Sequence, residues 1–295
     1  MSLAVAYFAD EAAPAERLAQ ALGATLRPLT VHRFPDGETM PRIDPPAGEA
    51  TVIYRSLDHP NDKLVNLLLA ADAARRAGAR RLFLVAPYFC YLRQDAVFAA
   101  GQPLSRDVIA PVIGASFDGV VTVQAHLHRT ADLTRTLGTA ACNLWAVEPL
   151  AAALPAYAQS PLIVGPDVES APWAAAWAKR LNGVAISLKK VRASDRKVTI
   201  AAPDAGFRGR PVVIIDDIAS SGETLELATE FARRGGASSI DVAVVHALMS
   251  ESATDRLERA GVRRIVSTDS VRHSTNAAVL APFLADAVRK MAEGP

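Results

Sequence analysis

Short apolar runs alternate along this chain with longer segments in which apolar residues recur at helical spacing. Runs of this length, rich in valine, isoleucine and leucine, are typical of buried strands, and the segments between them, rich in alanine, leucine and arginine, are typical of amphipathic helices. Alternating strands and helices predict parallel sheets covered by helices. The predicted strands are Leu3–Phe8, Thr51–Tyr54, Leu82–Ala86, Val120–Val123, Leu162–Val164, Val184–Leu188, Val212–Ile215, Val242–Val245 and Arg264–Val266.

One unit of helix, turn and strand occurs twice. LAADAARRAGARRLFLVA, from Leu69, aligns with LATEFARRGGASSIDVAV, from Leu227, with the Ala-Arg-Arg and Gly-Ala positions identical. Gly78 and Gly236 are expected to end their helices in the left-handed conformation. In so alanine-rich a chain, composition alone can also produce such a match. We nevertheless predict a duplicated domain, with a first copy at residues 1–148, a second at 149–275 and a C-terminal helix in 276–295 that packs on the first.

The segment at residues 212–228, VVIIDDIASSGETLELA, joins an apolar strand, two acids, a small hydroxylated loop and a helix. Ligands of open α/β sheets bind at the carboxyl ends of strands, and a helix start favours an anion. Carboxylates repel phosphate, so their partner would be ribose hydroxyls or hydrated Mg²⁺. The segment therefore predicts a site for a 5-phosphoribosyl group. Its candidate residues are Asp216, Asp217, Ser220, Ser221, Gly222 and Thr224.

A plainer interpretation of this segment is an ordinary strand-to-helix turn. Ser221 or Thr224 would then be the N-cap of the helix, and the two acids would be solvated. Glu223 bears on both interpretations, because a carboxylate there could crowd or repel phosphate while being favourable in the first turn of a helix.

Composition narrows the class of protein. The 32 Lys and Arg residues nearly balance 31 Asp and Glu residues, for a net charge of +1, so the chain has no basic field that would gather nucleic acid. Two cysteines, Cys90 and Cys142, fit a reduced compartment better than a disulfide framework. The sequence contains no signal-type segment and no run of ~18 uncharged apolar residues. We expect a cytoplasmic protein without nucleic-acid or membrane partners.

Two segments of the first half carry polar groups near predicted strand ends. HRFPDGE, at residues 32–38, places two acids around a glycine turn beside an aromatic ring, and APYFCYLRQD, at residues 86–95, follows a predicted strand. The plain interpretations are a simple turn and a surface ion pair.

His126 and Asp167 are candidate magnesium ligands, because each follows a predicted strand. Mg²⁺ beside nucleotide phosphates is commonly held through one or two carboxylates. A lone histidine is more often a hydrogen-bonded structural residue, and His128 competes with His126 for the role.

Five cations crowd the connection at residues 186–198, ISLKKVRASDRKV. Such a run is usually a solvated hairpin, but beside a phosphate site it could also act as a closing electrostatic clamp. The five are Lys189, Lys190, Arg192, Arg196 and Lys197.

Seven segments in this order resemble the ribose-phosphate pyrophosphokinase family along essentially the whole chain. They are RFPDGE, NDKLVNLLLAADAARRAGARR, PYFCYLRQD, TVQAH, GPD, KKVR and DDIASSGET. The short Lys-x-Arg arm and the DDIxSSG loop are closer to the archaeal-type branch. The resemblance implies an α/β fold of two duplicated type I phosphoribosyltransferase-like domains, each a mainly parallel sheet flanked by helices, with ATP on the first and ribose 5-phosphate on the second.

The resemblance also implies a role for each matching position. The ribose C1 hydroxyl would attack the β-phosphorus of ATP, with AMP leaving and Mg²⁺ assisting, in an active form that is at least a homodimer. The ATP of a neighbouring subunit would be bound by Phe34, Asp36 and Glu38, and ATP also by Arg93 and Gln94. Mg²⁺ would be bound by His126 and Asp167, and the catalytic cations would be Lys190 and Arg192. Ribose 5-phosphate would be bound by Asp216, Asp217, Ser220, Ser221, Gly222 and Thr224.

Three places depart from the family pattern. Gln124 stands where the family usually has the aspartate of Asp-Leu-His, residues 168–170 replace a glycine-containing turn, and Glu223 replaces a small residue. Two alternatives therefore stay open: a catalytically weak or silent regulatory homologue, and a phosphoribosyltransferase. The second explains neither the duplicated domain nor RFPDGE nor PYFCYLRQD.

Overall fold

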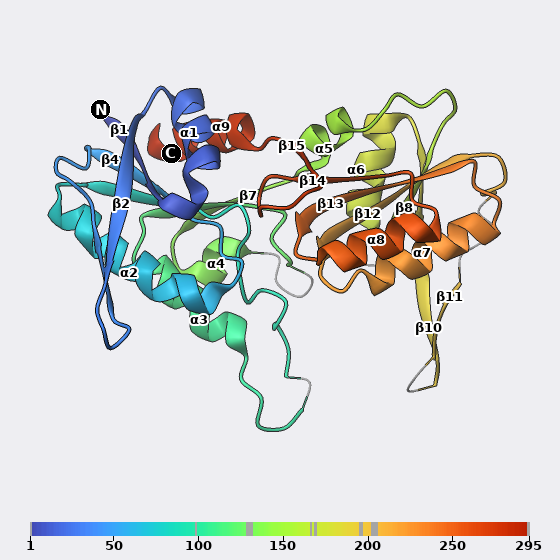
Figure 1. Cartoon of the computed structure of the whole chain (residues 1–295), viewed down its shortest axis with the longest axis horizontal. Coiled ribbons are helices and arrows are strands. Elements are labelled where there is room, and N and C mark those ends of the chain that lie inside the picture. Colours follow the sequence, from blue (N-terminus) through green and yellow to red (C-terminus); the bar gives the residue numbers. More distant parts are fainter. Residues whose placement is uncertain are drawn as a thin grey trace. The chain divides into compact units, whose positions relative to one another are not determined.

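The structure is a computed structural model of the chain, shown in Figure 1. It describes residues 2–97, 99–127, 132–165, 167, 170–194, 197–201 and 206–293, and only the backbone of 189–194 and 197–201. The chain divides into two compact units. Unit 1 comprises Met1–Leu144 and Leu280–Pro295, and unit 2 comprises Trp145–Val279.

Unit 1 contains a sheet with the strand order β3-β2-β1-β4-β5-β6-β7, parallel except for β3. Its central strands β4 and β6 are buried along their whole length, as expected when helices cover both faces of a parallel sheet. The strands are β1 (Leu3–Phe8), β2 (Thr25–Arg33), β3 (Thr39–Arg42), β4 (Ala50–Tyr54), β5 (Arg81–Val85), β6 (Gly119–Val123) and β7 (Ala140–Leu144). The helices are η1 (Ala9–Glu11), α1 (Ala12–Leu22), α2 (Pro60–Arg76), α3 (Ser105–Gly114), α4 (Leu133–Leu137) and α9 (Ala281–Glu293).

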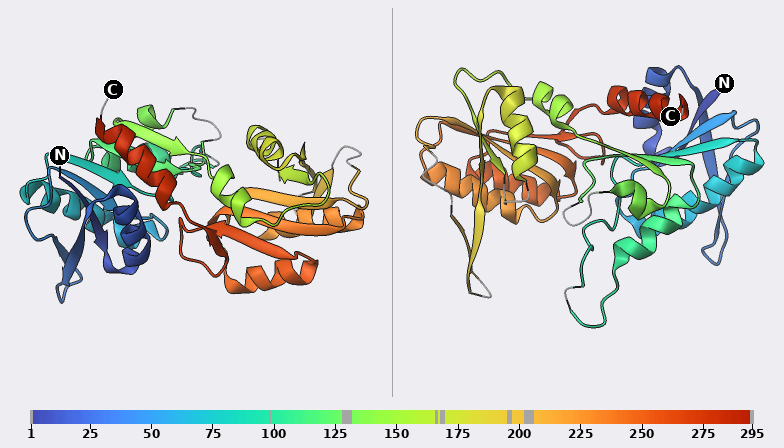
Figure 2. Two further views of the ribbon diagram at one scale, coloured as in Figure 1. Left: turned by 90° about the horizontal axis from the view of Figure 1, so that it is seen from above. Right: turned by 180° about the vertical axis from the view of Figure 1, so that it is seen from behind.

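Helix α9, the last element of the chain, belongs to unit 1 and lies beside α1 (Figures 1 and 2). The Arg81 guanidinium donates hydrogen bonds to the carbonyls of Met291 and Ala292, where the negative end of the helix dipole favours a cation. Gly119 at the start of β6 lets α9 approach closely, because a Cβ there would lie 2.4 Å from the Met291 sulfur and would force that side chain to move. These contacts hold α9 against β5 and β6.

Unit 2 contains a parallel sheet with the order β15-β14-β13-β12-β8-β9 and a separate hairpin, β10–β11, that projects from it (Figures 1 and 2). Its core packs β12 and β13 against α7 and α8, which lie side by side. The strands are β8 (Leu162–Gly165), β9 (Val184–Ser187), β10 (Lys189–Ser194), β11 (Lys197–Ala201), β12 (Pro211–Ala219), β13 (Ser239–Ala247), β14 (Arg264–Thr268) and β15 (Asn276–Ala278). The helices are α5 (Val147–Ala153), α6 (Ala171–Leu181), α7 (Glu223–Arg234) and α8 (Glu251–Ala260).

The two sheets have the same topology once β3 and the β10–β11 hairpin are set aside. In each, the second strand of the unit neighbours the first, and the third to sixth follow in sequence order on the other side. The repeated segments lie in equivalent places, on α2 after β4 and on α7 after β12. Gly78 and Gly236 follow these helices with φ of +104° and +81°. The predicted duplication and left-handed helix ends are confirmed.

The structure differs from the sequence-based expectation at one point that matters for the site. Asp216 and Asp217 were expected after their strand, but β12 runs to Ala219 and includes both. Pairing of β12 with β8 ends at Ile214, whereas pairing with β13 continues to Ala219. The two acids therefore lie on the part of β12 that has lost one neighbouring strand.

Candidate functional site

Three carboxylates gather at the carboxyl edge of the unit 2 sheet. Asp216 and Asp217 are half-buried near the end of β12, and Asp167 follows β8, the adjacent strand. Burial raises the pKa of Asp216 well above its usual range, and the negative charges of Asp217 and Asp167 raise it further. A cation or several hydrogen-bond donors at this edge would stabilise the ionised groups.

The Asp167 loop is held by Ser170, a residue of the turn that departs from the family pattern. The Ser170 N–H donates a 2.9 Å hydrogen bond to an Asp167 carboxylate oxygen, and the Ser170 hydroxyl donates to the Asp167 carbonyl at 2.6 Å. Residues 166, 168 and 169 lie outside the described part of the chain. Ser170 thus orients the carboxylate that was predicted to bind Mg²⁺.

The loop after β12 leads directly into the N-terminus of α7. Ser220 and Ser221 are exposed, whereas Gly222 is buried with φ +81° and is the N-cap of the helix. The alternative in which Ser221 or Thr224 is the N-cap of α7 is therefore wrong. The Ser221 hydroxyl contributes only a long hydrogen bond, accepted from the Glu223 N–H at 3.4 Å. A helix start with a glycine as N-cap leaves backbone N–H groups for an anion such as phosphate.

Arg256, on α8, contacts this loop, and nothing in the sequence pattern had indicated it. Its Nη2 donates a 2.8 Å hydrogen bond to the Ser221 carbonyl, and its Nε lies 3.3 Å from a carboxylate oxygen of Glu226 on α7. The contact joins residues 35 positions apart, so only the packing of α7 against α8 reveals it.

Phe34, Asp36 and Glu38 lie in the turn between β2 and β3. The Phe34 N–H donates to the Glu38 carbonyl at 2.8 Å, and the Glu38 N–H donates to an Asp36 carboxylate oxygen at 3.1 Å. All three residues are exposed, and the His32 ring stands edge-on to Phe34 with centroids 4.5 Å apart. The turn of this hairpin thus exposes an aromatic ring and two carboxylates to solvent.

Arg93 and Gln94 follow β5 on a segment anchored by neighbouring helices. The Tyr91 hydroxyl donates to the Asn61 side-chain oxygen at 2.6 Å, and the Ser105 hydroxyl donates to the Gln94 side-chain oxygen. Tyr91 has a φ of +61°, a strained conformation for a residue with a side chain. The anchoring leaves Arg93 and Gln94 exposed after the strand end.

His126 is half-buried three residues after β6. The strand end is fixed by hydrogen bonds from the Gln124 N–H to the Leu144 carbonyl at 2.7 Å and from the Ala125 N–H to the Asn143 side-chain oxygen at 2.8 Å. Gln124 has a φ of +44°, and its buried side-chain oxygen accepts no hydrogen bond from any described residue. The chain thus places a buried acceptor with no donor among the described residues two positions before His126.

Several predicted residues cannot be placed by their side chains. Lys190 and Arg192 lie on β10, but their side chains fall outside the described residues, as does all of His128. Within the described ranges, no group of three or more His, Cys, Asp or Glu side chains has the arrangement of a metal site. No helix in those ranges is long and apolar enough to cross a membrane.

The position in unit 1 that is equivalent to the acid pair of unit 2 is filled by internal ion pairs. Arg55, directly after β4, contacts Asp10 at 2.7 Å and Glu11 at 3.2 Å, and Lys63 contacts Asp58 at 2.6 Å. Burial raises the pKa of Glu11 to about 7, although Arg55 and Lys63 oppose the shift. Unit 1 therefore has no open acid pair for a ribose at this place.

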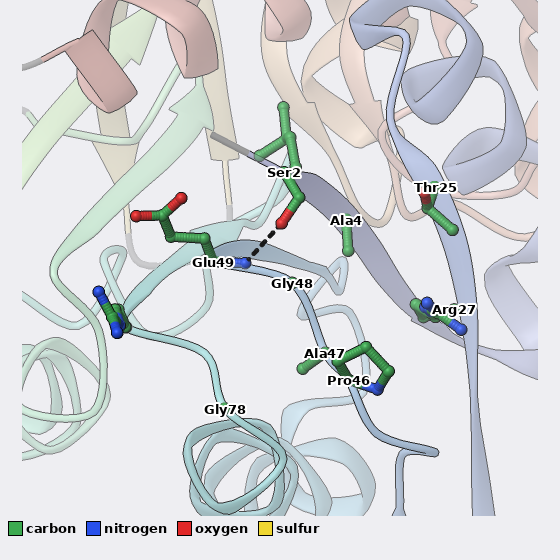
Figure 3. A pocket seen from close by; sticks show the side chains of 11 residues that line it. Ser2, Ala4, Thr25, Arg27, Pro46, Ala47, Gly48, Glu49 and Gly78 are labelled. Atoms are coloured by element: carbon green, nitrogen blue, oxygen red, sulfur yellow. Dashed lines mark hydrogen bonds between the residues drawn. The ribbon is translucent and has the colours of Figure 1, made fainter.

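A cavity of about 450 Å³ lies elsewhere, at the amino ends of the unit 1 strands (Figure 3). Its lining includes Ser2, Thr25, Gly48 and Arg80, and the Ser2 hydroxyl accepts a hydrogen bond from the Glu49 N–H at 3.0 Å. None of the predicted site residues lines it. It is therefore separate from the candidate site, which follows the carboxyl ends of the strands.

Comparison with known proteins agrees with this architecture. A family model described as the N-terminal domain of ribose phosphate pyrophosphokinase matches residues 5–116, and a phosphoribosyl transferase domain model matches residues 145–279. The chain is similar in fold to the crystal structure of phosphoribosylpyrophosphate synthetase from Mycobacterium smegmatis, with a TM-score of 0.87, 23% identity and full coverage of both chains. The fold is thus that of an enzyme built from two phosphoribosyltransferase-type domains.

Sequence relatives define the family. The chain is 33% identical to a ribose-phosphate pyrophosphokinase from Methanopyrus kandleri, over 93% of this chain and 94% of the relative. It is 34% identical to one from Halobacterium salinarum, over 93% of this chain and 96% of the relative. The chain belongs to the ribose-phosphate pyrophosphokinase family. The predicted family and fold class are confirmed, and neither the phosphoribosyltransferase nor the silent homologue is favoured.

Proposed function

We propose that this chain transfers the β,γ-diphosphate of ATP to the C1 hydroxyl of ribose 5-phosphate, giving phosphoribosyl pyrophosphate and AMP. The observation that carries this proposal is the edge of unit 2, where Asp216 and Asp217 lie directly before a loop that opens the N-terminus of α7. Acids suited to ribose hydroxyls are thereby placed next to a backbone suited to the 5-phosphate.

Ribose 5-phosphate would bind along this loop. The backbone N–H groups of Ser221 and Gly222 donate to no acceptor among the described residues, so they are available to phosphate oxygens. Ser220 and Thr224 would add hydroxyl groups, and Asp217 would accept hydrogen bonds from the ribose diol. Because Glu223 is exposed on the first turn of α7, its carboxylate is free to point into solvent away from the phosphate.

The residues at the strand ends suit Mg²⁺. Burial raises the pKa of Asp216, two neighbouring carboxylates raise it further, and a divalent cation would offset the repulsion between the three acids. We expect Asp167 and His126 to be magnesium ligands, each directly or through a water molecule. When bound, Mg²⁺ neutralises charge on the transferred phosphates.

ATP would bind through residues of unit 1. Phe34 offers an exposed aromatic face for the base, Asp36 and Glu38 offer acceptors for amino and hydroxyl groups, and Arg93 and Gln94 follow a strand end. By family resemblance the hairpin would serve the ATP of a neighbouring subunit, so we propose that the active form is at least a homodimer.

Catalysis would depend mainly on positioning and charge. In phosphoryl transfer the protein performs little covalent chemistry, and the transition state gains most from cations and fixed geometry. Lys190 and Arg192, carried on the β10–β11 hairpin, would approach the phosphates when the substrates are bound.

An assay of AMP release tests the proposal. Wild-type protein should release AMP from ATP only when ribose 5-phosphate and Mg²⁺ are both present, and omission of either should abolish release. AMP release at the same rate with and without ribose 5-phosphate would contradict the proposal. A protein that instead joins a base to phosphoribosyl pyrophosphate would be a phosphoribosyltransferase.

A further inference from the structure

Arg256 connects helix α8 with the loop that precedes α7. Its Nη2 donates to the Ser221 carbonyl at 2.8 Å, its Nε pairs with Glu226 at 3.3 Å, and its Nη1 lies 3.5 Å from the carbonyl of Ser252 on α8. The side chain is 40% exposed. The guanidinium is therefore fixed between two helices, with one of its contacts on the loop backbone.

The contact with the Ser221 carbonyl sets the direction of a neighbouring donor. The peptide that joins Ser221 to Gly222 is trans, so its C=O and N–H groups point in opposite directions. With the carbonyl held toward Arg256, the Gly222 N–H is turned away from α8. No described residue accepts a hydrogen bond from this N–H. A buried, unpaired donor at a helix start is suited to an anionic oxygen.

The loop packs closely on α8 at the same place. A Cβ added to Gly222 would lie 3.4 Å from the Cβ of Ala253, and the φ of +81° already disfavours a side chain there. The Gly222 carbonyl accepts a 2.9 Å hydrogen bond from the Glu226 N–H. The Ser221 and Gly222 carbonyls are thus both occupied by protein donors. The arrangement directs carbonyl oxygens away from a bound phosphate, which they would repel.

We propose that Arg256 is a positioning residue for the 5-phosphate of the sugar substrate. It holds the peptide between Ser221 and Gly222 in the orientation that presents the Gly222 N–H to the phosphate, and its charge offsets that of Glu226. The proposal rests on the function proposed above, and it assigns to α8 a role in substrate affinity that its sequence does not indicate.

The test measures ribose 5-phosphate affinity in four variants. Isothermal titration with Mg²⁺ and α,β-methylene-ATP, which cannot transfer its diphosphate, gives the dissociation constant, and steady-state assays give the KM for each substrate. Arg256→Ala should weaken ribose 5-phosphate binding about 10-fold, the effect of losing a charge-assisted hydrogen bond, with the KM for ATP unchanged. Arg256→Lys, which retains one cationic donor, should recover part of the loss.

Two further variants show whether Arg256 acts by positioning the loop or only by joining α7 to α8 through its ion pair with Glu226. Glu226→Gln removes the charge of the pair but leaves the Ser221 contact, so it should bind ribose 5-phosphate within about 2-fold of wild type. Arg259→Ala is the matched control, because Arg259 is an exposed arginine of α8 whose side chain makes no hydrogen bond or ion pair with the described residues. It should be indistinguishable from wild type.

The outcomes are distinct. Equal affinity in Arg256→Ala and wild type, or equal losses in Glu226→Gln and Arg256→Ala, would overturn the positioning role. An equal rise in the KM of both substrates would mark Arg256 as a general structural residue. If wild-type protein neither binds ribose 5-phosphate nor turns over, the proposed function itself fails.

Discussion

Charged residues at equivalent places in the two units have different surroundings. In unit 2, Asp216 and Asp217 lie on the part of β12 that has lost one neighbouring strand, at the carboxyl edge of the sheet. In unit 1, the equivalent place is closed by contacts of Arg55 and Lys63 with three acids, of which Glu11 is buried. A buried ion pair adds little net stability because its desolvation is costly. We therefore expect the stability of this network in unit 1 to change when its buried acid gains or loses a proton.

Glu11 should make the stability of unit 1 depend on pH. Its pKa is about 7 in the folded chain against 4.5 when unperturbed, because burial outweighs the attraction of Arg55 and Lys63. A raised carboxyl pKa stabilises the fold fully below the unfolded value, and this contribution is lost as pH rises through about 7. The free energy of unfolding of wild type, measured in urea, should therefore fall by up to about 3 kcal/mol more between pH 4.5 and pH 8 than that of Glu11→Gln.

Glu16→Gln, at an exposed position of α1, is the control for the Glu11 experiment. Its pH profile of unfolding free energy should follow that of wild type. Parallel profiles for wild type and Glu11→Gln would show that the Glu11 carboxyl is not protonated on folding.

Asp217→Asn should impair use of ribose 5-phosphate and leave the fold intact. The change is nearly isosteric and lies at a ligand edge, but it removes an anionic acceptor for the ribose hydroxyls. The KM for ribose 5-phosphate should rise about 10-fold or more, with the melting temperature within about 2 °C of wild type. Asp255→Asn, exposed on α8, should change neither quantity. A lower melting temperature with normal kinetics would instead identify Asp217 as a structural residue.

At the scale of elements, the sequence predicted the buried strands and the repeated helix-to-strand unit, because those segments are uniformly apolar or periodic. It did not predict β2, in which only Leu29 is buried, nor the edge strands β3 and β7, nor β15, which has three residues. The anchoring of Gln94 by Ser105 and of the phosphate loop by Arg256 could not be predicted either. Such contacts join segments whose proximity depends on the packed fold rather than on local pattern.

The β10–β11 hairpin should be a catalytic element rather than a solvated one. Lys190→Ala should lower turnover by about 10²-fold or more while leaving the KM for ribose 5-phosphate within a few-fold, since the cation is expected to meet the phosphates chiefly in the transition state. Lys179→Ala, an exposed lysine on α6, serves as the control. Unchanged turnover in Lys190→Ala would show that Lys190 takes no part in catalysis and that the hairpin is a structural or solvated element.

At the scale of the whole molecule, the proposed ATP residues lie in unit 1 and the proposed ribose 5-phosphate residues in unit 2. If the β2–β3 turn serves a neighbouring subunit, a chain with Asp36→Ala and Glu38→Ala and a chain with Lys190→Ala should each be nearly inactive. Co-assembled, they should regain part of the activity, because some sites combine two intact halves. No recovery in demonstrated mixed oligomers would mean that each chain forms its site alone.

The central claim is that two phosphates move together from ATP to the sugar. The most direct measurement follows ³¹P nuclear magnetic resonance of ATP incubated with wild-type protein, ribose 5-phosphate and Mg²⁺. The account predicts that the β- and γ-phosphorus signals of ATP are replaced by those of a diphosphate on the ribose C1 oxygen, with one AMP formed for each. Formation of ADP with a sugar bisphosphate, or no conversion by correctly folded protein, would contradict it.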